Sequence, residues 1–391
     1  MNHNDKFPVV LMIMLCTRCA MGGAEKRYAR VFQMLVAQTS AQHKLLITRS
    51  MLELLQAAGI LTQHDDHLII LDPPFRRRVP ITWLRPMLWL LDVLWYVWQC
   101  GLVIHRQRPD IIHPLLTGVY LSLPAVLLHP KARRVMSAYS YEFESYRDRR
   151  IFGIPIGASI KRFAMQRCHV IDALSMLIRD DLVQRGIPTW KIKVTPCAFT
   201  DLSLCHPATE RKKWVVFLHR FVGLKNPLTL ADAMPKVIAQ HPDVHFYFLG
   251  AGYLQAKLEE RVQELDLADY VTIRYEPHPM SVLNESLIFV TLQDVSSYPN
   301  QSLLEAMACG NAVLATDVGE TWRLVDETNG IRIPLSTMTP DAVADALINL
   351  MDDPKLSQYG KASRSRVLSE HTAERYFAYI ADVYRNATHE I

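Results

Sequence analysis

Leu292 to Glu320 reads LQDVSSYPNQSLLEAMACGNAVLATDVGE, and the expected architecture of the chain follows from this stretch. Its pattern predicts the end of a buried strand, a polar turn, a short helix, a second apolar strand and a glycine-containing loop. Pro299 fixes φ in the turn just before the helix, which is expected from about Ser302. A strand, a helix and a second strand in this order are typical of a parallel α/β sheet.

The start of this short helix is a candidate anion site. The first amides of a helix have no partner within it, and the helix dipole places positive charge there. We therefore expect the amides of Gln301, Ser302 and Leu303 to bind a phosphate. Glu305 lies about one turn further along, so it can reach a ribose hydroxyl of the same ligand. Taken alone, an apolar helix of this kind is more often simply core packing.

Residues 300–320, NQSLLEAMACGNAVLATDVGE, resemble the donor-site segment of the family 4 glycosyltransferases. That family has two glutamates separated by seven residues, followed by Ala-Met-Ala-x-Gly and a glycine-containing loop. Glu305 occupies the position of the second glutamate, whereas Ser297 occupies that of the first. The resemblance implies the GT-B fold, a nucleotide diphosphate sugar as donor, and retention of anomeric configuration. Ser297 would then contact the transferred sugar with a hydroxyl in place of a carboxylate.

A basic loop is expected beside this segment. Arg220-Phe-Val-Gly-Leu-Lys225 follows the apolar run Trp214 to Leu218, which predicts a strand. Ligands of doubly wound sheets bind beyond the carboxyl ends of strands. A guanidinium and an ammonium there can neutralise the diphosphate that leaves during glycosyl transfer. Arg220 and Lys225 match the Arg and Lys of the family's corresponding loop, although basic loop residues are more often merely solvated.

Weaker signals complete the predicted donor site. Leu249-Gly-Ala-Gly252 resembles the family's Gly-x-Gly turn, which a purely structural turn explains equally well. Arg274, at the end of another predicted strand, lies where the family brackets the nucleotide base. Gly22 and Gly23 follow the first predicted strand, and paired glycines let a backbone approach a ligand closely. In the family, a loop in this place faces the donor phosphates or the acceptor.

Size and periodicity predict the domain organisation. The chain has 391 residues, of which 50% are hydrophobic and 21% charged, as in globular proteins with two cores. Strand and helix patterns alternate through both halves, so we predict two doubly wound Rossmann-like domains. The resemblance implies that they face a cleft, as in the GT-B fold, with an acceptor-side domain at 1–205, a donor domain at 206–370, and a closing helix at 371–391 that packs back on the first domain. Thr372 is the expected N-cap of that helix.

Composition also excludes some classes of protein and site. A formal net charge of +4 is small for this length and argues against a dedicated nucleic-acid binder. The odd count of seven cysteines does not suggest a disulfide framework, so Cys16-Thr-Arg-Cys19 is interpreted as reduced thiols. The N-terminus lacks a signal-peptide pattern, so the cytoplasm is the expected compartment. We expect no cofactor and no metal, because the sequence offers no Asp-x-Asp clamp in a predicted cleft loop.

One segment points towards a membrane. Met87 to Ile104 is apolar and nearly long enough to span a bilayer, but it contains Asp92 and Gln99. We interpret it as a helix that packs on the sheet. The segment at 75–85 either contacts anionic lipid at the inner face of the cytoplasmic membrane or is an ordinary basic loop. Its aromatic and basic residues are Phe75, Arg76, Arg77, Arg78, Trp83 and Arg85.

The sequence therefore predicts a metal-independent, retaining glycosyltransferase with Arg220, Lys225 and Glu305 as its catalytic residues. Its donor would be a nucleotide diphosphate sugar, and its acceptor a polysaccharide or a lipid-linked oligosaccharide, as in capsule or lipopolysaccharide synthesis. One alternative is a catalytically silent subunit that binds nucleotide or serves in assembly. A nucleotide-sugar epimerase is a third hypothesis, which would need acid–base groups that the sequence does not identify.

Overall fold

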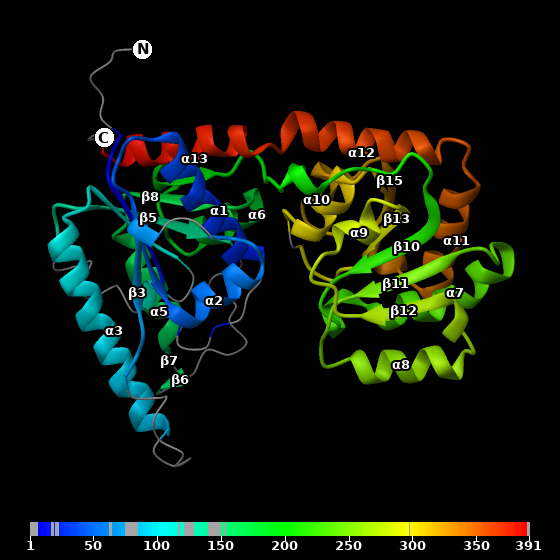
Figure 1. Ribbon diagram of the computed structural model, residues 1–391, viewed down its shortest axis with the longest axis horizontal. Helices are drawn as coiled ribbons and strands as arrows, with labels where there is room; N and C mark the ends of the chain where they lie inside the picture. Colours follow the sequence, from blue (N-terminus) through cyan, green and yellow to red (C-terminus); the bar gives the residue numbers. More distant parts are fainter. Residues whose placement is uncertain are drawn as a thin grey trace. The chain divides into compact units, whose positions relative to one another are not determined.

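The structure is a computed structural model that describes residues 7–16, 19, 23–61, 65–74, 85–115, 118–120, 129–139, 150–151, 154–296 and 298–388 (Figure 1). The chain divides into two compact units. The first comprises Met1–Thr195 together with Phe377–Ile391, and the second comprises Pro196–Tyr376.

The first unit is built on a seven-stranded parallel sheet with the order β3-β2-β1-β4-β5-β8-β9. Its central strand, β1, is buried along its whole length, which explains the unbroken apolar run in the sequence. The strands are β1 Val10–Met14, β2 Lys44–Thr48, β3 Leu68–Leu71, β4 Ile111–Pro114, β5 Arg133–Ala138, β8 Val170–Ala173 and β9 Ile192–Val194. A separate antiparallel pair is formed by β6 Arg150–Ile151 and β7 Ile154–Pro155.

Helices connect these strands. They are α1 Gly23–Gln38, α2 Arg49–Ala57, α3 Arg85–Gln107, α5 Ile156–Gln166 and α6 Met176–Gln184. Among the helices in the described residues, α3 is the one that is long and apolar enough to cross a membrane: Met87–Gln107 has a mean hydropathy of 1.6, and 33% of the most apolar window is buried. The predicted packing on the sheet is confirmed for one side of α3, since Tyr96, Cys100 and Ile104 belong to the same buried cluster as strand residues of β1 to β4.

The last helix, α13 Ala373–Thr388, completes the first unit through a buried polar network. The Tyr379 hydroxyl donates to Asp172 at 2.7 Å, and the Tyr384 hydroxyl lies 2.8 Å from Nδ1 of His113. Ser137 links the two, lying 3.0 Å from His113 and donating to Asp172 at 3.0 Å. Burial lowers the pKa of His113 to about 3, so its imidazole is neutral. Every member of the network therefore has a partner, as buried polar groups require.

The Cys16–Cys19 segment differs from its prediction. The structure joins these two residues in a disulfide directly after β1, where their Cα atoms lie 5.4 Å apart and thus within the range of such a bond. The prediction of reduced thiols is therefore wrong for this pair. The free cysteines, Cys100, Cys168, Cys197, Cys205 and Cys309, are all buried.

The second unit is built on a six-stranded parallel sheet with the order β12-β11-β10-β13-β14-β15. The chain enters at β10, extends to β12 on one side, and then returns to β13 and extends to β15 on the other. The strands are β10 Lys212–Leu218, β11 His245–Leu249, β12 Val271–Arg274, β13 Ser286–Thr291, β14 Ala312–Asp317 and β15 Gly330–Pro334. This reversal of direction between β10 and β13 is the topological switch point of a doubly wound sheet.

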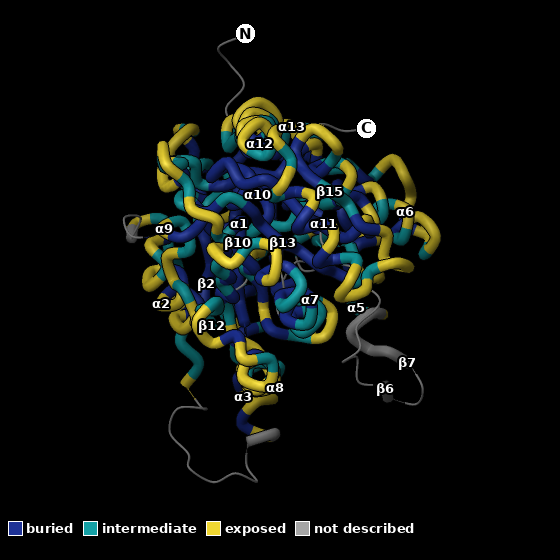
Figure 2. The backbone as a smooth tube through the Cα atoms, turned by 90° about the vertical axis from the view of Figure 1, so that its right-hand side faces the viewer, coloured by how far each residue is buried: buried dark blue, intermediate teal, exposed yellow. Residues whose placement is uncertain are grey.

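Helices cover both faces of this sheet. Val215 and Phe217 of β10 pack in a cluster with one group of helices, whereas the intervening Val216 packs with the other, as the alternation of a strand requires. The first group is α7 Pro227–Gln240, α8 Gln255–Glu264 and α11 Pro340–Asp352; the second is α9 Met280–Leu283, α10 Gln301–Ala308 and α12 Leu356–Glu370. Strands β13 and β14 at the centre of the sheet are almost wholly buried, whereas Figure 2 shows α8 and α12 as largely exposed.

The boundary between the units differs from the one expected at 205/206. The structure places it at 195/196, and residues 206–208 pack on the second unit. The amide of His206 donates to Oδ1 of Asn284 at 2.8 Å, and the amide of Ala208 donates to the Asn284 carbonyl at 2.8 Å. At the other end, Thr372 caps α13 as predicted, its hydroxyl accepting from the amide of Arg375 at 3.2 Å.

Candidate active site

The candidate site lies at the switch point of the second sheet, where the loops after β10 and β13 leave neighbouring strands in opposite directions. Residues 219–226 connect β10 to α7, and residues 292–300 connect β13 to α10. Parallel strands end at the same edge of a sheet, so these two loops emerge side by side. They carry Arg220 and Lys225 on one side and the start of α10 on the other, as the sequence predicts.

The β10 loop is fixed against the next loop along the sheet. The amide of Phe221 donates to the carbonyl of Ala251 at 3.0 Å, and the amide of Leu254 donates to the carbonyl of Phe221 at 3.0 Å. A Cβ atom on Gly252 would lie 2.2 Å from the Phe221 carbonyl oxygen, and one on Gly250 would lie 2.0 Å from that of His219. Both glycines are thus required by close backbone packing, which gives the Gly-x-Gly turn a structural role.

Asn226 joins the two loops of the site. It adopts a left-handed conformation, with φ 52° and ψ 46°, which asparagine tolerates better than most residues. Its side-chain amide donates to Oδ1 of Asp294 at 2.6 Å and to the carbonyl of Leu292 at 3.2 Å. The amide of Asp294 in turn donates to the carbonyl of Leu224 at 3.2 Å. These three contacts hold the basic loop against the segment that leads into α10.

Lys225 is a partly buried cation. Its ammonium donates to Oε1 of Gln293, a buried neutral partner whose own amide group donates to the Thr291 hydroxyl at 2.9 Å. Burial, and secondarily the nearby charge of Arg220, lower the pKa of Lys225 to about 8. Arg220 itself is exposed. Two like charges held close together in this way form a region suited to an anion with more than one negative charge.

The N-terminus of α10 is capped by Asn300, whose side chain accepts from the amide of Leu303 at 3.5 Å. Of the three amides predicted to bind phosphate, that of Leu303 therefore already has a partner. The prediction of phosphate binding now applies to the amides of Gln301 and Ser302. The side-chain amide of Gln301 donates to Glu305 at 3.3 Å, one turn into the helix. Glu305 is intermediate in exposure and thus accessible to a ligand.

Other predicted site residues lie elsewhere. Arg274 ends β12, two strands away from β10, and its guanidinium pairs with Glu276 at 2.8 Å. Gly23 begins α1 in the first unit. Gly22 and Ser297 lie outside the described residues, as does most of the predicted lipid-contact segment, residues 75–84. The roles of these residues remain predictions.

The sequence analysis did not assign Asn226 and Gln293 to the site, and it mentioned neither as a contact. Asn226 could not have been found from its local sequence, because a residue before a proline is expected to be extended, whereas Asn226 is left-handed. Gln293 had no signal either. Its importance depends on Lys225, which lies far away in the sequence.

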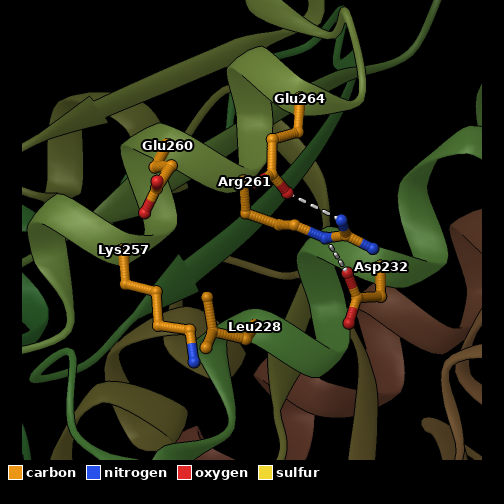
Figure 3. Close-up of a pocket in the computed structure, with 6 residues that line it drawn as sticks. All are labelled: Leu228, Asp232, Lys257, Glu260, Arg261 and Glu264. Carbon is orange, nitrogen blue, oxygen red and sulfur yellow. Dashed lines mark hydrogen bonds and ion pairs between the residues drawn. The ribbon is translucent and has the colours of Figure 1, made fainter.

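A separate hollow of about 260 Å³ lies on the outer side of α7 and α8 (Figure 3). Arg261 pairs there with Asp232 at 2.6 Å and with Glu264 at 2.8 Å, and Lys257 and Glu260 add one charge of each sign. These side chains come from helix faces and not from the strand ends, and they comprise three acidic and two basic groups. We interpret the hollow as a solvated ion-pair surface. Within the residues that the structure describes, no three His, Cys, Asp or Glu side chains are grouped so that they could hold a metal.

Comparisons with known proteins agree with this geometry. The glycosyl transferases group 1 family matches residues 212–353, which include both loops of the site and α10. The second unit is a group 1 glycosyltransferase domain. A comparison of structures covers nearly the whole chain. The glycosyltransferase of Rickettsia africae superposes with a TM-score of 0.72 at 13% identity, over 99% of this chain and 100% of that one. The GT-B fold class predicted from the sequence is confirmed.

Two curated relatives resemble part of this chain in sequence. The phosphatidyl-myo-inositol mannosyltransferase of Mycolicibacterium smegmatis is 30% identical over 172 residues, 42% of this chain and 42% of that protein. The D-inositol 3-phosphate glycosyltransferase of Paenarthrobacter aurescens is 30% identical over 197 residues, 44% of this chain and 47% of that protein. The chain thus matches these relatives over less than half of their length.

Proposed function

We propose that the protein transfers a sugar from a nucleotide diphosphate sugar to a lipid-linked or polysaccharide acceptor, with retention of configuration and without a metal. The observation that carries this proposal is the pair of cations on the β10 loop, which Asn226 holds against the segment leading into α10. The names of the relatives support a glycosyl donor, and the mannosyltransferase acts on a phosphatidylinositol lipid. The same proposal includes a cytoplasmic location at the inner face of the membrane.

Each residue has a role in this proposal. Negative charge grows on the departing diphosphate as the sugar bond breaks, and fixed cations stabilise that charge most in the transition state. Arg220 and Lys225 would bind the diphosphate, together with the amides of Gln301 and Ser302 at the positive end of α10. Glu305 would accept hydrogen bonds from the ribose. The same cations that bind the nucleotide diphosphate would therefore also stabilise it as it separates from the sugar.

The first prediction tests this site. Arg220→Ala and Lys225→Ala should each remove a charge-assisted contact and weaken nucleotide diphosphate binding about ten- to hundredfold. Calorimetric titration of the purified protein measures the affinity. Lys257→Ala is the matched control, because it removes a cation from the α8 surface of the same unit and should leave the affinity unchanged. Unchanged affinity in both site variants would contradict the assignment.

A turnover assay distinguishes the proposed enzyme from the alternative, a catalytically silent subunit that only binds nucleotide. Incubation with a panel of nucleotide sugars and a membrane lipid extract should release nucleotide diphosphate, and chelator should not reduce the rate. Proton NMR of the product then tests retention through the anomeric coupling. Nucleotide binding without release of diphosphate from any donor would favour the silent subunit.

A further inference from the structure

Helix α3 has an apolar face on each side. Its inner face packs on the first sheet, where Leu88, Tyr96, Cys100 and Ile104 are buried. Its outer face carries Met87, Leu90, Leu94 and Trp98 at the spacing of one helix stripe, and Trp89 and Leu91 flank them. Leu94 is 57% exposed and Trp98 is 60% exposed, whereas Tyr96 between them is 2% exposed. A helix on the surface of a water-soluble domain normally presents charged residues on this side.

Charge is missing from the outer face of α3. Over Met87 to Ile104 the one Asp, Glu, Lys or Arg residue is Asp92, and it is turned inward, with 1% of the residue exposed. Cations gather instead at the C-terminal end, where Arg106 and Arg108 are exposed. The segment that contains His129 and Lys131 lies beside this end of the helix, since the rings of His129 and His105 are 6.0 Å apart. Lys131 is exposed and adds a further cation. The surface is thus an uncharged stripe that ends in a basic cluster.

This combination fits the interface of an anionic bilayer. Large exposed apolar patches mark binding surfaces, and tryptophan concentrates where hydrocarbon meets lipid head groups. Basic residues beside such a patch attract anionic lipid. A transmembrane orientation does not fit, because the inner face of α3 is part of the core of the first unit. In Figure 1, α3 runs along one side of the first unit, and its N-terminal end extends beyond the strands.

We propose that the outer face of α3, formed by Met87, Leu90, Leu94 and Trp98, lies in the plane of an anionic membrane and inserts these side chains among the head groups. The choice of a bilayer over a second copy of the chain rests on the proposed function, whose acceptor is lipid-linked. This surface is distinct from the segment at 75–85, and it changes the interpretation of α3 as only a core helix.

The test uses the full-length protein in flotation with vesicles of phosphatidylcholine, with and without phosphatidylglycerol, and with no donor or acceptor present. Leu90→Gln, Leu94→Gln and Trp98→Gln combined should reduce partitioning by at least about tenfold, because each change removes the burial of an apolar side chain. Trp190→Gln is the matched control: Trp190 is 63% exposed elsewhere in the first unit, and its loss should have no effect. The double variant Arg106→Gln with Arg108→Gln tests the basic cluster. Its partitioning should depend less on phosphatidylglycerol and less on salt than that of the wild-type protein.

Circular dichroism shows whether the triple variant folds, and the single Leu94→Gln variant replaces it if it does not. The proposal is overturned if wild type floats with neither vesicle, or if the triple variant floats as well as wild type. It is also overturned if sedimentation shows a wild-type dimer that the triple variant dissociates, because a second copy would then cover the face. Nucleotide affinity of Arg220→Ala and Lys225→Ala is measured without membranes, so failure of this inference and failure of the proposed function are distinguishable.

Discussion

Lys225 donates to a neutral partner, Gln293, and lies near the positive charge of Arg220. In the same loop His219 is held neutral, since burial lowers its pKa. In the proposed function, a nucleotide diphosphate places negative charge beside both cations.

This setting predicts how binding depends on pH. The pKa of Lys225 is lowered to about 8, so the ammonium is present below that pH and is lost above it. Affinity for nucleotide diphosphate should fall as the pH rises through about 8. Gln293→Glu places a carboxylate beside the ammonium, raises its pKa and should move this fall to higher pH. Calorimetry at several pH values measures the shift, and Lys225→Arg is the control, since arginine stays charged. An unshifted profile for Gln293→Glu would refute the contact.

At the residue scale, sequence reasoning identified groups whose chemistry is visible in a motif. Arg220, Lys225 and Glu305 could be predicted as site residues because they stand after a strand or in a helix start and match the motifs of the resembled family; their roles remain predictions. Gln293 and Asn226 were not found, because their roles depend on contacts between segments far apart in the chain. A neutral amide has no charge or spacing that marks it in advance.

Among the elements, α12 Leu356–Glu370 was not predicted, although it packs on α10. Its sequence, LSQYGKASRSRVLSE, lacks an apolar stripe, and its buried residues are Gly360, Ser363 and Val367. A Cβ atom on Gly360 would lie 2.1 Å from the carbonyl oxygen of Gly310, just after α10. The two helices thus meet through close backbone contact, which hydrophobic periodicity cannot reveal. By contrast, β10 was predicted from its apolar run Trp214 to Leu218, which the observed strand contains.

This contact gives a prediction about stability. Gly360→Ala should destabilise the second unit by about 1–3 kcal/mol, because the methyl group must push α12 away from the Gly310 backbone. In a helix without this contact, the same change should raise the free energy of unfolding, since alanine is the better helix former by about 1 kcal/mol. A decrease therefore indicates the tight contact. Thermal unfolding measures the change. Ser365→Ala, on the exposed side of α12, is the control and should be neutral or slightly stabilising. A Gly360→Ala protein as stable as wild type would rule out the tight contact.

Across the whole molecule, buried neutral histidines occur in both units. Burial is the main cause that lowers the pKa of His113 to about 3 and the pKa values of His43, His169 and His371 to about 4. In the unfolded chain these groups bind protons near pH 6.5. The unfolded state therefore binds more protons between about pH 6.5 and 4, and stability falls as the pH drops through this window.

The expected result is a melting temperature that decreases steadily from pH 6.5 towards pH 4. His371→Asn, whose side-chain oxygen can accept from the amide of Ala198 in place of the imidazole, should reduce this decrease. His278→Asn changes an exposed histidine and should leave it unaltered. If His371→Asn and wild type lose stability equally, His371 does not contribute to the acid response.

The two α/β units could be predicted at this scale because strand and helix patterns alternate in both halves. The boundary between them could not, since a polar, proline-containing segment reads as a linker whether or not it packs against a neighbour such as Asn284. The assignment of α13 to the first unit came from the family resemblance, and its polar anchors to Asp172 and His113 have no pattern in the sequence.

The position of α13 also affects the order in which the protein can be completed on the ribosome. The strands of the first unit are made before the second unit, but Tyr379 and Tyr384 are made after it. At roughly 5–20 residues per second, the second unit takes on the order of ten seconds or more to synthesise. Throughout that interval Asp172 and His113 can have only water in place of the missing hydroxyls. The first unit is therefore begun before the second unit and completed after it.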